Sequence, residues 1–175
     1  MQSIRIEPLK AEPQIIETLS EILVEVVANG GSVSFMYPLD LETARSFWIG
    51  SLSAAERGER IILGAFDGEY LVGTVTLILD CPPNQPHRAE IAKMMTRISH
   101  RGRGIAKKLM QVAERLAVER ERTLLVLDTA EEEGASGLYE KLGFTLAGVI
   151  PDYAFKPHGG LTGTMVYWKR IGEEL

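Results

Sequence analysis

The chain has 175 residues, of which 45% are hydrophobic and 25% are charged, the balance of a globular domain large enough to bury its own core. Its net charge of −5 argues against a surface built as a whole to hold nucleic acid, and its single cysteine, Cys81, excludes an internal disulfide and suits a reducing cytoplasm. Because we find neither an N-terminal apolar leader nor an apolar run of ~20 residues, we expect one domain over residues 1–175, in the cytoplasm and without a membrane partner.

The first third of the chain predicts a strand and two helices. Alternating apolar residues over 4–9 are typical of a strand, and apolar residues at helical spacing over 13–29 predict a helix that the glycines after it would end. Asp40 can cap a second helix that runs to about residue 57. The stretch between the two helices, 32–40, predicts a loop.

The middle of the chain predicts an antiparallel meander. Strands over 60–66 and 70–79 flank Asp67-Gly68, which is a strong hairpin signal. A proline-rich loop follows, which cannot be regular structure, and another strand is expected over 87–98.

The last third predicts two helices and three strands. The first of these strands is short and wholly apolar, which is typical of a buried strand with a parallel neighbour. In chain order the predicted ranges are 105–122 (helix), 124–127 (strand), 135–142 (helix), 145–150 (strand) and 164–168 (strand). A meander followed by a strand–helix–strand crossover predicts a mixed α/β sheet with helices packed on it.

The stretch SHRGRGIAKKL, residues 99–109, places glycines and basic residues at the start of a predicted helix. The first turn of a helix has unpaired backbone N–H groups and the positive end of the helix dipole, which together bind anions. Gly102 and Gly104 would let a bulky anion approach the backbone closely. The basic residues around them are Arg101, Arg103, Lys107 and Lys108. The expected ligand is a diphosphate.

Three phosphate-binding motifs compete for this stretch. The spacing of a Walker loop is absent, and in the dinucleotide motif G-x-G-x-x-G the third glycine is replaced by Lys107. Asp128, at the end of the next predicted strand, favours the dinucleotide motif, but the antiparallel meander ahead of the loop argues against it. The third motif is Arg/Gln-x-x-Gly-x-Gly/Ala between a strand and a long helix, and residues 101–106 match it.

That third motif is the acyl-CoA signature of the GCN5-related N-acetyltransferases (GNAT), and the sequence resembles this family over nearly its whole length. The family's second signature, L-Y-x-x-x-G-F on a short helix, is similar to GASGLYEKLGF at 134–144. Within the family, NGGSVSFMYPLD, HRAEIAKMM and LLVLDT are most similar to the tabtoxin-resistance acetyltransferases. The resemblance implies an α/β (α+β) fold: a mixed, mostly antiparallel central sheet flanked by helices, with a V-shaped splay between its fourth and fifth strands.

The resemblance also implies acetyl-CoA as cosubstrate, no metal, and transfer of an acetyl group to a primary amine of a small molecule by direct attack in a ternary complex. The implied acceptor is an amino-acid-like or antibiotic amine, similar to tabtoxinine-β-lactam. Two alternatives stay open: a peptide or protein N-acetyltransferase, and a non-catalytic acyl-CoA-binding sensor. No nucleic-acid partner is expected, and the final strands offer an edge that could pair two copies in a homodimer.

Carried onto this sequence, the cofactor site combines the glycine–arginine loop with the strand before it. Backbone N–H groups of the loop would bind the pyrophosphate, and the strand would pair with pantetheine. A bulge in that strand would aim one N–H at the thioester oxygen. The implied cofactor-binding residues are Met94, Met95, Thr96, Arg101, Gly102, Arg103, Gly104, Ile105, Ala106 and Lys107.

The implied catalytic residues are a tyrosine and two acids. Tyr139, in the second signature, would protonate the departing thiolate. A lysine-like amine, with a pKa near ~10.4, needs a base before it can attack; Asp128 is the first candidate, Glu90 the second and His87 the third. Glu132 stands where many relatives carry a cofactor-contacting Asn, so that contact is expected to be lost or replaced.

The acceptor is expected between the loop at 32–40 and the last hairpin. Acidic residues near this mouth favour a cationic amine. The open alternative is that the loop's Phe35 and Met36 simply fill the core beneath the sheet. The candidate acceptor-binding residues are Phe35, Met36, Tyr37, Asp40 and Tyr153.

Overall fold

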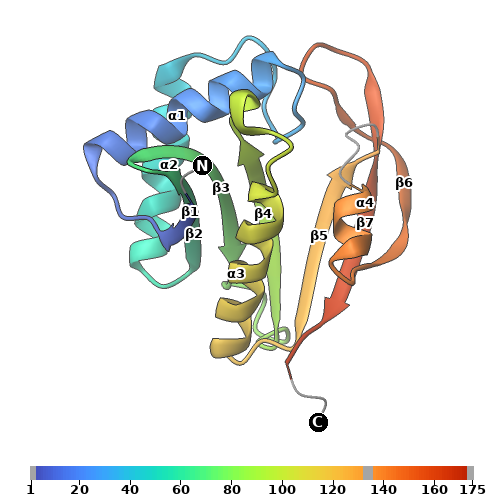
Figure 1. The fold of residues 1–175 in the computed structure, drawn as a ribbon. Coiled ribbons are helices and arrows are strands. Elements are labelled where there is room, and N and C mark those ends of the chain that lie inside the picture. Colours follow the sequence, from blue (N-terminus) through green and yellow to red (C-terminus); the bar gives the residue numbers. More distant parts are fainter. Residues whose placement is uncertain (1–2, 132–135, 173–175) are drawn as a thin grey trace.

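The computed structural model describes residues 3–131 and 136–172. The strands are β1 (Ile4–Pro8), β2 (Arg60–Asp67), β3 (Tyr70–Ile78), β4 (Arg88–Thr96), β5 (Leu124–Ala130), β6 (Thr145–Phe155) and β7 (Leu161–Arg170). The helices are α1 (Pro13–Ala28), α2 (Leu41–Glu56), α3 (Ile105–Glu119) and α4 (Ser136–Lys141), with a 3-10 turn at Ile98–His100. One sheet holds the strands in the order β1-β2-β3-β4-β5-β7-β6, and all of its neighbouring pairs in the described chain are antiparallel except β4–β5 (Figure 1). The mixed, mostly antiparallel sheet flanked by helices confirms the predicted fold class.

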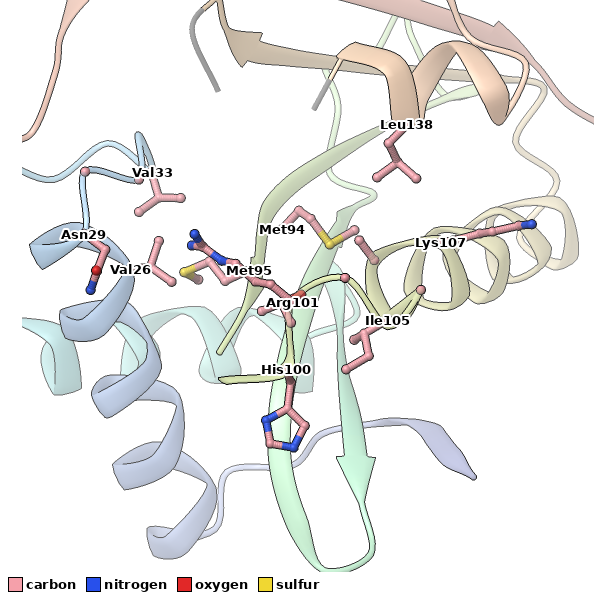
Figure 2. Close-up of a pocket in the computed structure, with 16 residues that line it drawn as sticks. Val26, Asn29, Val33, Met94, Met95, His100, Arg101, Ile105, Lys107 and Leu138 are labelled. Atoms are coloured by element: carbon pink, nitrogen blue, oxygen red, sulfur yellow. The ribbon is translucent and has the colours of Figure 1, made fainter. Parts of the chain in front are cut away.

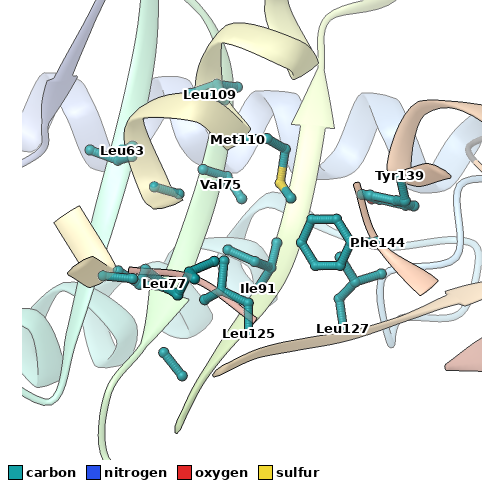
Figure 3. Packing of buried hydrophobic residues seen from close by; sticks show 14 of the residues in the cluster. Leu63, Val75, Leu77, Ile91, Leu109, Met110, Leu125, Leu127, Tyr139 and Phe144 are labelled. Atoms are coloured by element: carbon teal, nitrogen blue, oxygen red, sulfur yellow. The ribbon is translucent and has the colours of Figure 1, made fainter. Parts of the chain in front are cut away.

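The sheet has a hydrophobic core on each face. Successive side chains of a strand point to opposite faces, so the neighbours Ile62 and Leu63 on β2 enter different cores. Ile62 packs in the core built with α1 and α2, where Trp48 is fully buried. Leu63 packs in the core built with α3 and α4, which Figure 3 shows around Leu109 and Phe144. In the described residues, no helix has the length and apolar character of a membrane span.

The parallel strands β4 and β5 pair only where they begin. The register joins 88–90 to 124–126, and beyond these residues the two strands separate (Figure 1). The C-terminal half of β4 therefore has a hydrogen-bonded neighbour, β3, on one side only. This separation is the V-shaped splay that the resemblance implied.

A bulge interrupts β4 beside the splay. Lys93 and Met94 together lie opposite one residue of β3, Val75. Lys93 has a φ of +53°, a left-handed conformation that strains a residue with a side chain. The bulge expected in this strand is thus present, and it lies where the two parallel strands part.

Several predicted boundaries were wrong, chiefly in the last hairpin. The strand expected to end at residue 150 continues as β6 to Phe155, because a bulge between Ile150 and Ala154 absorbs the proline and its neighbours without ending the pairing. Pro151 is tolerated there because β6 is an edge strand that need not donate every N–H. β5 also extends past 127 to Ala130, since its last residues pair with β7.

Other boundaries moved by a few residues. The strand predicted over 87–98 ends at Thr96, and the helix predicted to reach about residue 122 ends at Glu119. The fourth helix begins at Ser136, and position 135 lies outside the described residues. Asp40 caps α2 as predicted, accepting a hydrogen bond from the backbone N of Thr43 at 2.7 Å.

Candidate active site

The glycine–arginine stretch forms the start of α3. Gly102 and Gly104 have φ angles of +77° and +75°, and a Cβ at either position would meet no atom within 4 Å, so the loop surface is open. Gly104 is the N-cap, and the N–H of Lys108 donates to its carbonyl at 3.1 Å. The N–H groups of residues 105–107 therefore lack partners inside the helix and point out of its N-terminus, as an anion site requires.

A cavity of about 530 Å³ opens in front of this helix end, and we call it the anion cavity. Figure 2 shows Val26 and Asn29, at the end of α1, on one side of it, and Ile105 and Leu138 on the other. Every predicted cofactor-binding residue except Arg103 lines it: Met94, Met95, Thr96, Arg101, Gly102, Gly104, Ile105, Ala106 and Lys107.

Two residues at the edge of this cavity, Arg103 and His100, lie close to Asp67. Arg103 does not line the cavity; its Nη1 lies 3.9 Å from Oδ2 of Asp67, in the β2–β3 hairpin. His100 was missed: it lines the cavity, and its Nε2 lies 3.1 Å from the same oxygen. Its place directly before the motif was the available signal. The side chain of Met95 is buried in the core, as expected, so only its backbone is left to bind a ligand.

A second cavity, of about 390 Å³, lies between the splayed halves of β4 and β5, and we call it the central cavity. It brings together all three predicted catalytic residues, Tyr139, Asp128 and Glu90. It also shares lining residues with the anion cavity, so the two are continuous. The shared residues are Val33, Met94, Ala106 and Leu138.

A third cavity, of about 280 Å³, lies between the α1–α2 loop and the β6–β7 hairpin, and we call it the loop cavity. Phe35, Met36 and Tyr153, three of the predicted acceptor-binding residues, line it. It shares Ser34 and Asp128, among others, with the central cavity. The three cavities thus form one connected series from the start of α3 to the loop.

The other two predicted acceptor-binding residues lie outside this series. The ring of Tyr37 packs on that of His158 with centroids 4.3 Å apart, and its backbone N donates to the carbonyl of Pro157 at 3.0 Å. The contacts tie the loop to the β6–β7 hairpin. Asp40 serves as the cap of α2, and the hydrogen bonds from Thr43 lower the pKa of its carboxyl.

Phe35 satisfies both interpretations that the sequence left open. It packs edge-on against Phe47 at a centroid distance of 5.3 Å, in the core under α1 and α2, and it also lines the loop cavity. Met36 is half exposed and does not fill the core.

The three catalytic candidates are held in different ways. Tyr139 is 5% exposed, with its ring against those of Phe144 and Tyr167. Asp128 lies inside β5 and accepts a hydrogen bond from Oγ1 of Thr164 at 2.9 Å.

Glu90, in contrast, forms an ion pair with a neighbour on its own strand. Nη1 of Arg88 donates to its Oε1 at 2.6 Å. Asp128 is thus oriented by a neutral hydroxyl, whereas one oxygen of Glu90 already binds a cation.

Sequence reasoning missed Lys93, which also lines the central cavity. Its Nζ donates to Oγ of Ser34 at 3.0 Å and lies 5.7 Å from the ring centroid of Phe47. Burial lowers the pKa of this ammonium, and the negative charge of Asp128 partly opposes the shift. A lysine inside an otherwise half-buried strand was the signal in the sequence.

Other chemistry finds little support in the described residues. No three His, Cys, Asp or Glu side chains within 3–131 and 136–172 gather to hold a metal ion. Cys81 lines none of the three cavities; its Sγ donates to the carbonyl of Arg88 at 3.3 Å, and burial raises the pKa of its thiol. Glu132 lies outside the described residues.

Known proteins share both sequence and fold with this chain. The profile of the acetyltransferase (GNAT) family matches residues 31–144. Streptothricin acetyltransferase of Escherichia coli is 32% identical over 107 residues, which cover 60% of this chain and 59% of that protein. N-acetyltransferase 8B of Homo sapiens is 37% identical over 82 residues, which cover 46% of this chain and 36% of that protein. The matches therefore span about a third to three-fifths of the length of these curated relatives.

A solved structure shows the likeness of fold over nearly the whole chain. The structure of an N-acetyltransferase from Staphylococcus aureus has a TM-score of 0.80 at 20% identity, covering 97% of this chain and 99% of that chain.

Proposed function

The chain belongs to the acetyltransferase (GNAT) family, and we propose that it transfers the acetyl group of acetyl-CoA to a primary amine of a small molecule by direct attack in a ternary complex. The observation that carries the proposal is the connected series of three cavities. A cosubstrate at one end and an acceptor at the other would meet beside Asp128 and Tyr139.

The residues present fit the cosubstrate. The start of α3 supplies N–H groups and an open glycine backbone for a pyrophosphate, and the splay leaves the end of β4 free to pair with the amides of pantetheine. When bound, acetyl-CoA supplies the acetyl group as an activated thioester. No metal is part of the proposal.

The chain's own residues act on both sides of the reacting centre. The bulge at Lys93–Met94 removes a backbone N–H from the ladder with β3, and such a donor stabilises negative charge on the thioester oxygen. Asp128, oriented by Thr164, takes the proton of the attacking amine, and Glu90 is the second candidate. Tyr139 gives its proton to the thiolate, a modest demand because thiols have a pKa of roughly 8.5.

An antibiotic or amino-acid-like amine is the acceptor class that we propose. The similarity to streptothricin acetyltransferase supports an antibiotic amine. The narrower likeness to the tabtoxin-resistance enzymes stays a proposal, since the antibiotic-modifying relative reported above acts, by its name, on streptothricin. A peptide acceptor needs an open groove, whereas here Tyr37 ties the loop to the opposite hairpin.

A homodimer along β6 also stays a proposal. β6 is one of the two edge strands of the described sheet, and all of its residues are exposed, among them Val149, Ile150 and Phe155. Exposed apolar edges can pair with a second copy. Sedimentation equilibrium would show a dimer at micromolar concentration, and a monomer there would contradict the proposal.

Release of coenzyme A tests the proposed function. The enzyme would be given acetyl-CoA and a panel of amines: amino acids, aminoglycosides, polyamines, streptothricin and short peptides. We expect turnover on small amines and not on peptides. Turnover on peptides alone would favour the peptide acetyltransferase, and stabilisation by acetyl-CoA without any turnover would favour the sensor.

A further inference from the structure

Lys93 places a cation inside the central cavity. Its ammonium is close to the hydroxyl of Ser34, at 3.0 Å, and to the ring of Phe47, at 5.7 Å. Among the residues that the structure describes, no carboxylate lies within ion-pair distance of it. Lys93 is half-buried, and a hydroxyl and an aromatic face compensate a partly desolvated ammonium only in part.

The backbone brings this side chain to the cavity in spite of strain. Lys93 occupies the bulge with a φ of +53°, a conformation that glycine would adopt with less strain. The bulge alone needs no lysine. The backbone geometry therefore does not explain why a lysine occupies this position.

An opposite charge faces the same cavity from the other side of the splay. Asp128, on β5, lines the cavity and interacts with Lys93 through space without forming an ion pair. Glu90 is paired with Arg88, and Arg60, the other charged group acting on Lys93, is a cation. Among the described residues that line the cavity, Lys93 on β4 and Asp128 on β5 are thus charged groups without an ion pair.

We propose that Lys93, together with the hydroxyl of Ser34, selects acceptors that carry a carboxylate beside the amine, while Asp128 receives the amine. The carboxylate would complete the coordination of the ammonium, which a neutral or purely cationic amine would leave unpaired. The inference rests on the proposed acetyl transfer and narrows its acceptor to amines that bear a carboxylate. It replaces the purely cationic acceptor favoured by the acidic residues near the mouth.

Pairs of substrates that differ in one charge test the proposal. Each L-amino acid would be compared with its own carboxamide by release of coenzyme A at saturating acetyl-CoA. We expect kcat/KM for the free acid to exceed that for the amide by about tenfold or more, as for a charge-assisted hydrogen bond. The α-amine of the carboxamide is less basic than that of the free acid, so a larger fraction of it is neutral and able to attack. This difference favours the amide and so works against the expected preference for the acid.

Variants then assign the preference to Lys93. In Lys93→Gln the acid-to-amide ratio should fall to about one, chiefly through the KM of the acid. Lys93→Arg should restore part of the ratio, because guanidinium also binds carboxylates. Ser34→Ala should lower it severalfold. Lys10→Gln, at an exposed lysine outside the three cavities, is the matched control.

The outcomes separate this inference from the proposed function. Equal use of acid and amide, an unchanged ratio in Lys93→Gln, or turnover on no amine that bears a carboxylate would each overturn the role of Lys93. Turnover on other amines would still leave acetyl transfer standing. Failure of acetyl-CoA to raise the melting temperature, with no turnover on any amine, would overturn both.

Discussion

At the scale of single residues, the ring of Tyr139 packs against two other aromatic rings. Because Phe144 and Tyr167 contact this ring, Tyr139→Phe should keep the ring packing and remove the proton donor. We expect kcat to fall about ten- to a hundredfold, since thiolate is a tolerable leaving group, with the KM for acetyl-CoA little changed. Release of coenzyme A measures this effect. An unchanged kcat would remove Tyr139 from the mechanism.

The two candidate bases should respond differently to loss of charge. Asp128→Asn should lower kcat/KM about a hundredfold for a lysine-like amine, because that amine must lose a proton before it attacks. Glu90→Gln should have a smaller effect, since Arg88 already binds one of its oxygens. The check is a rate profile over about pH 6–9 for both variants. Activity unchanged in both would defeat the two assignments.

Lys93 should lower the stability of the free protein. Because burial lowers the pKa of its ammonium, the unfolded chain holds this proton more tightly than the folded one. The destabilisation is fully present below the folded pKa and is lost as the pH rises toward the ordinary lysine value of about 10.4. Lys93→Met should therefore be more stable than the wild type near neutral pH, by a margin that shrinks at about pH 9.5. Urea unfolding at the two pH values tests this, and a margin independent of pH would contradict it.

These residues also show which parts of the site could be predicted from the sequence. The lining of the anion cavity could be predicted because the motif acts through backbone N–H groups, whose positions follow from a helix start. Lys93 was missed because the residue at which the expected bulge falls, and so the direction of its side chain, does not follow from simple alternation. The packing of Tyr37 could not be predicted for a related reason: its ring lies against that of His158, which is far away in sequence.

At the scale of elements, a side chain added at the start of α3 should weaken binding of the cosubstrate, whereas one added in a turn outside the cavities should not. Gly104 and Gly58 both have positive φ, and a Cβ added at either would meet no atom within 4 Å, but only Gly104 lines the anion cavity. An alanine at either site should cost about 1 kcal/mol of stability. Only Gly104→Ala should also raise the KM for acetyl-CoA, by about tenfold.

Thermal unfolding and initial rates on the two variants separate strain from ligand binding. An equal rise in the KM for acetyl-CoA in both variants would mean that backbone strain, rather than contact with the ligand, weakens its binding. No rise in Gly104→Ala would mean that the glycine is not needed for close approach of the ligand.

Element boundaries depended on contacts that lie outside the elements. Pro151 and Asp152 predict the end of a strand, yet β6 continues because its pairing with β7 resumes at Ala154. Likewise β5 extends because β7 pairs with Asp128 and the residues after it. The extension matters for function, since it places Asp128 on a rigid strand beside Thr164.

At the scale of the whole molecule, the site is a property of the sheet. The cavity series exists because β4 and β5 pair only at their beginnings, and each core braces one face of the divided sheet. Composition and periodicity predicted a mixed sheet, but only the family resemblance implied the splay. Beyond the point where they separate, β4 stays paired to β3 and β5 stays paired to β7.

Ligand binding across the two halves should therefore stabilise the whole chain. The anion cavity is lined from α1, β4 and α3, and from Leu138 on α4, so a ligand there bridges elements on both sides of the splay. Acetyl-CoA at about a hundred times its Kd should add about 2.7 kcal/mol, a rise of about 5–10 °C in melting temperature for a chain of this length. Differential scanning fluorimetry measures this, with an amine alone as the control. Because the ligand must approach the N–H groups at the start of α3 closely, Gly104→Ala should show a smaller rise at the same concentration, whereas Gly58→Ala should show the full one. Equal rises in both variants would place the cosubstrate away from that helix.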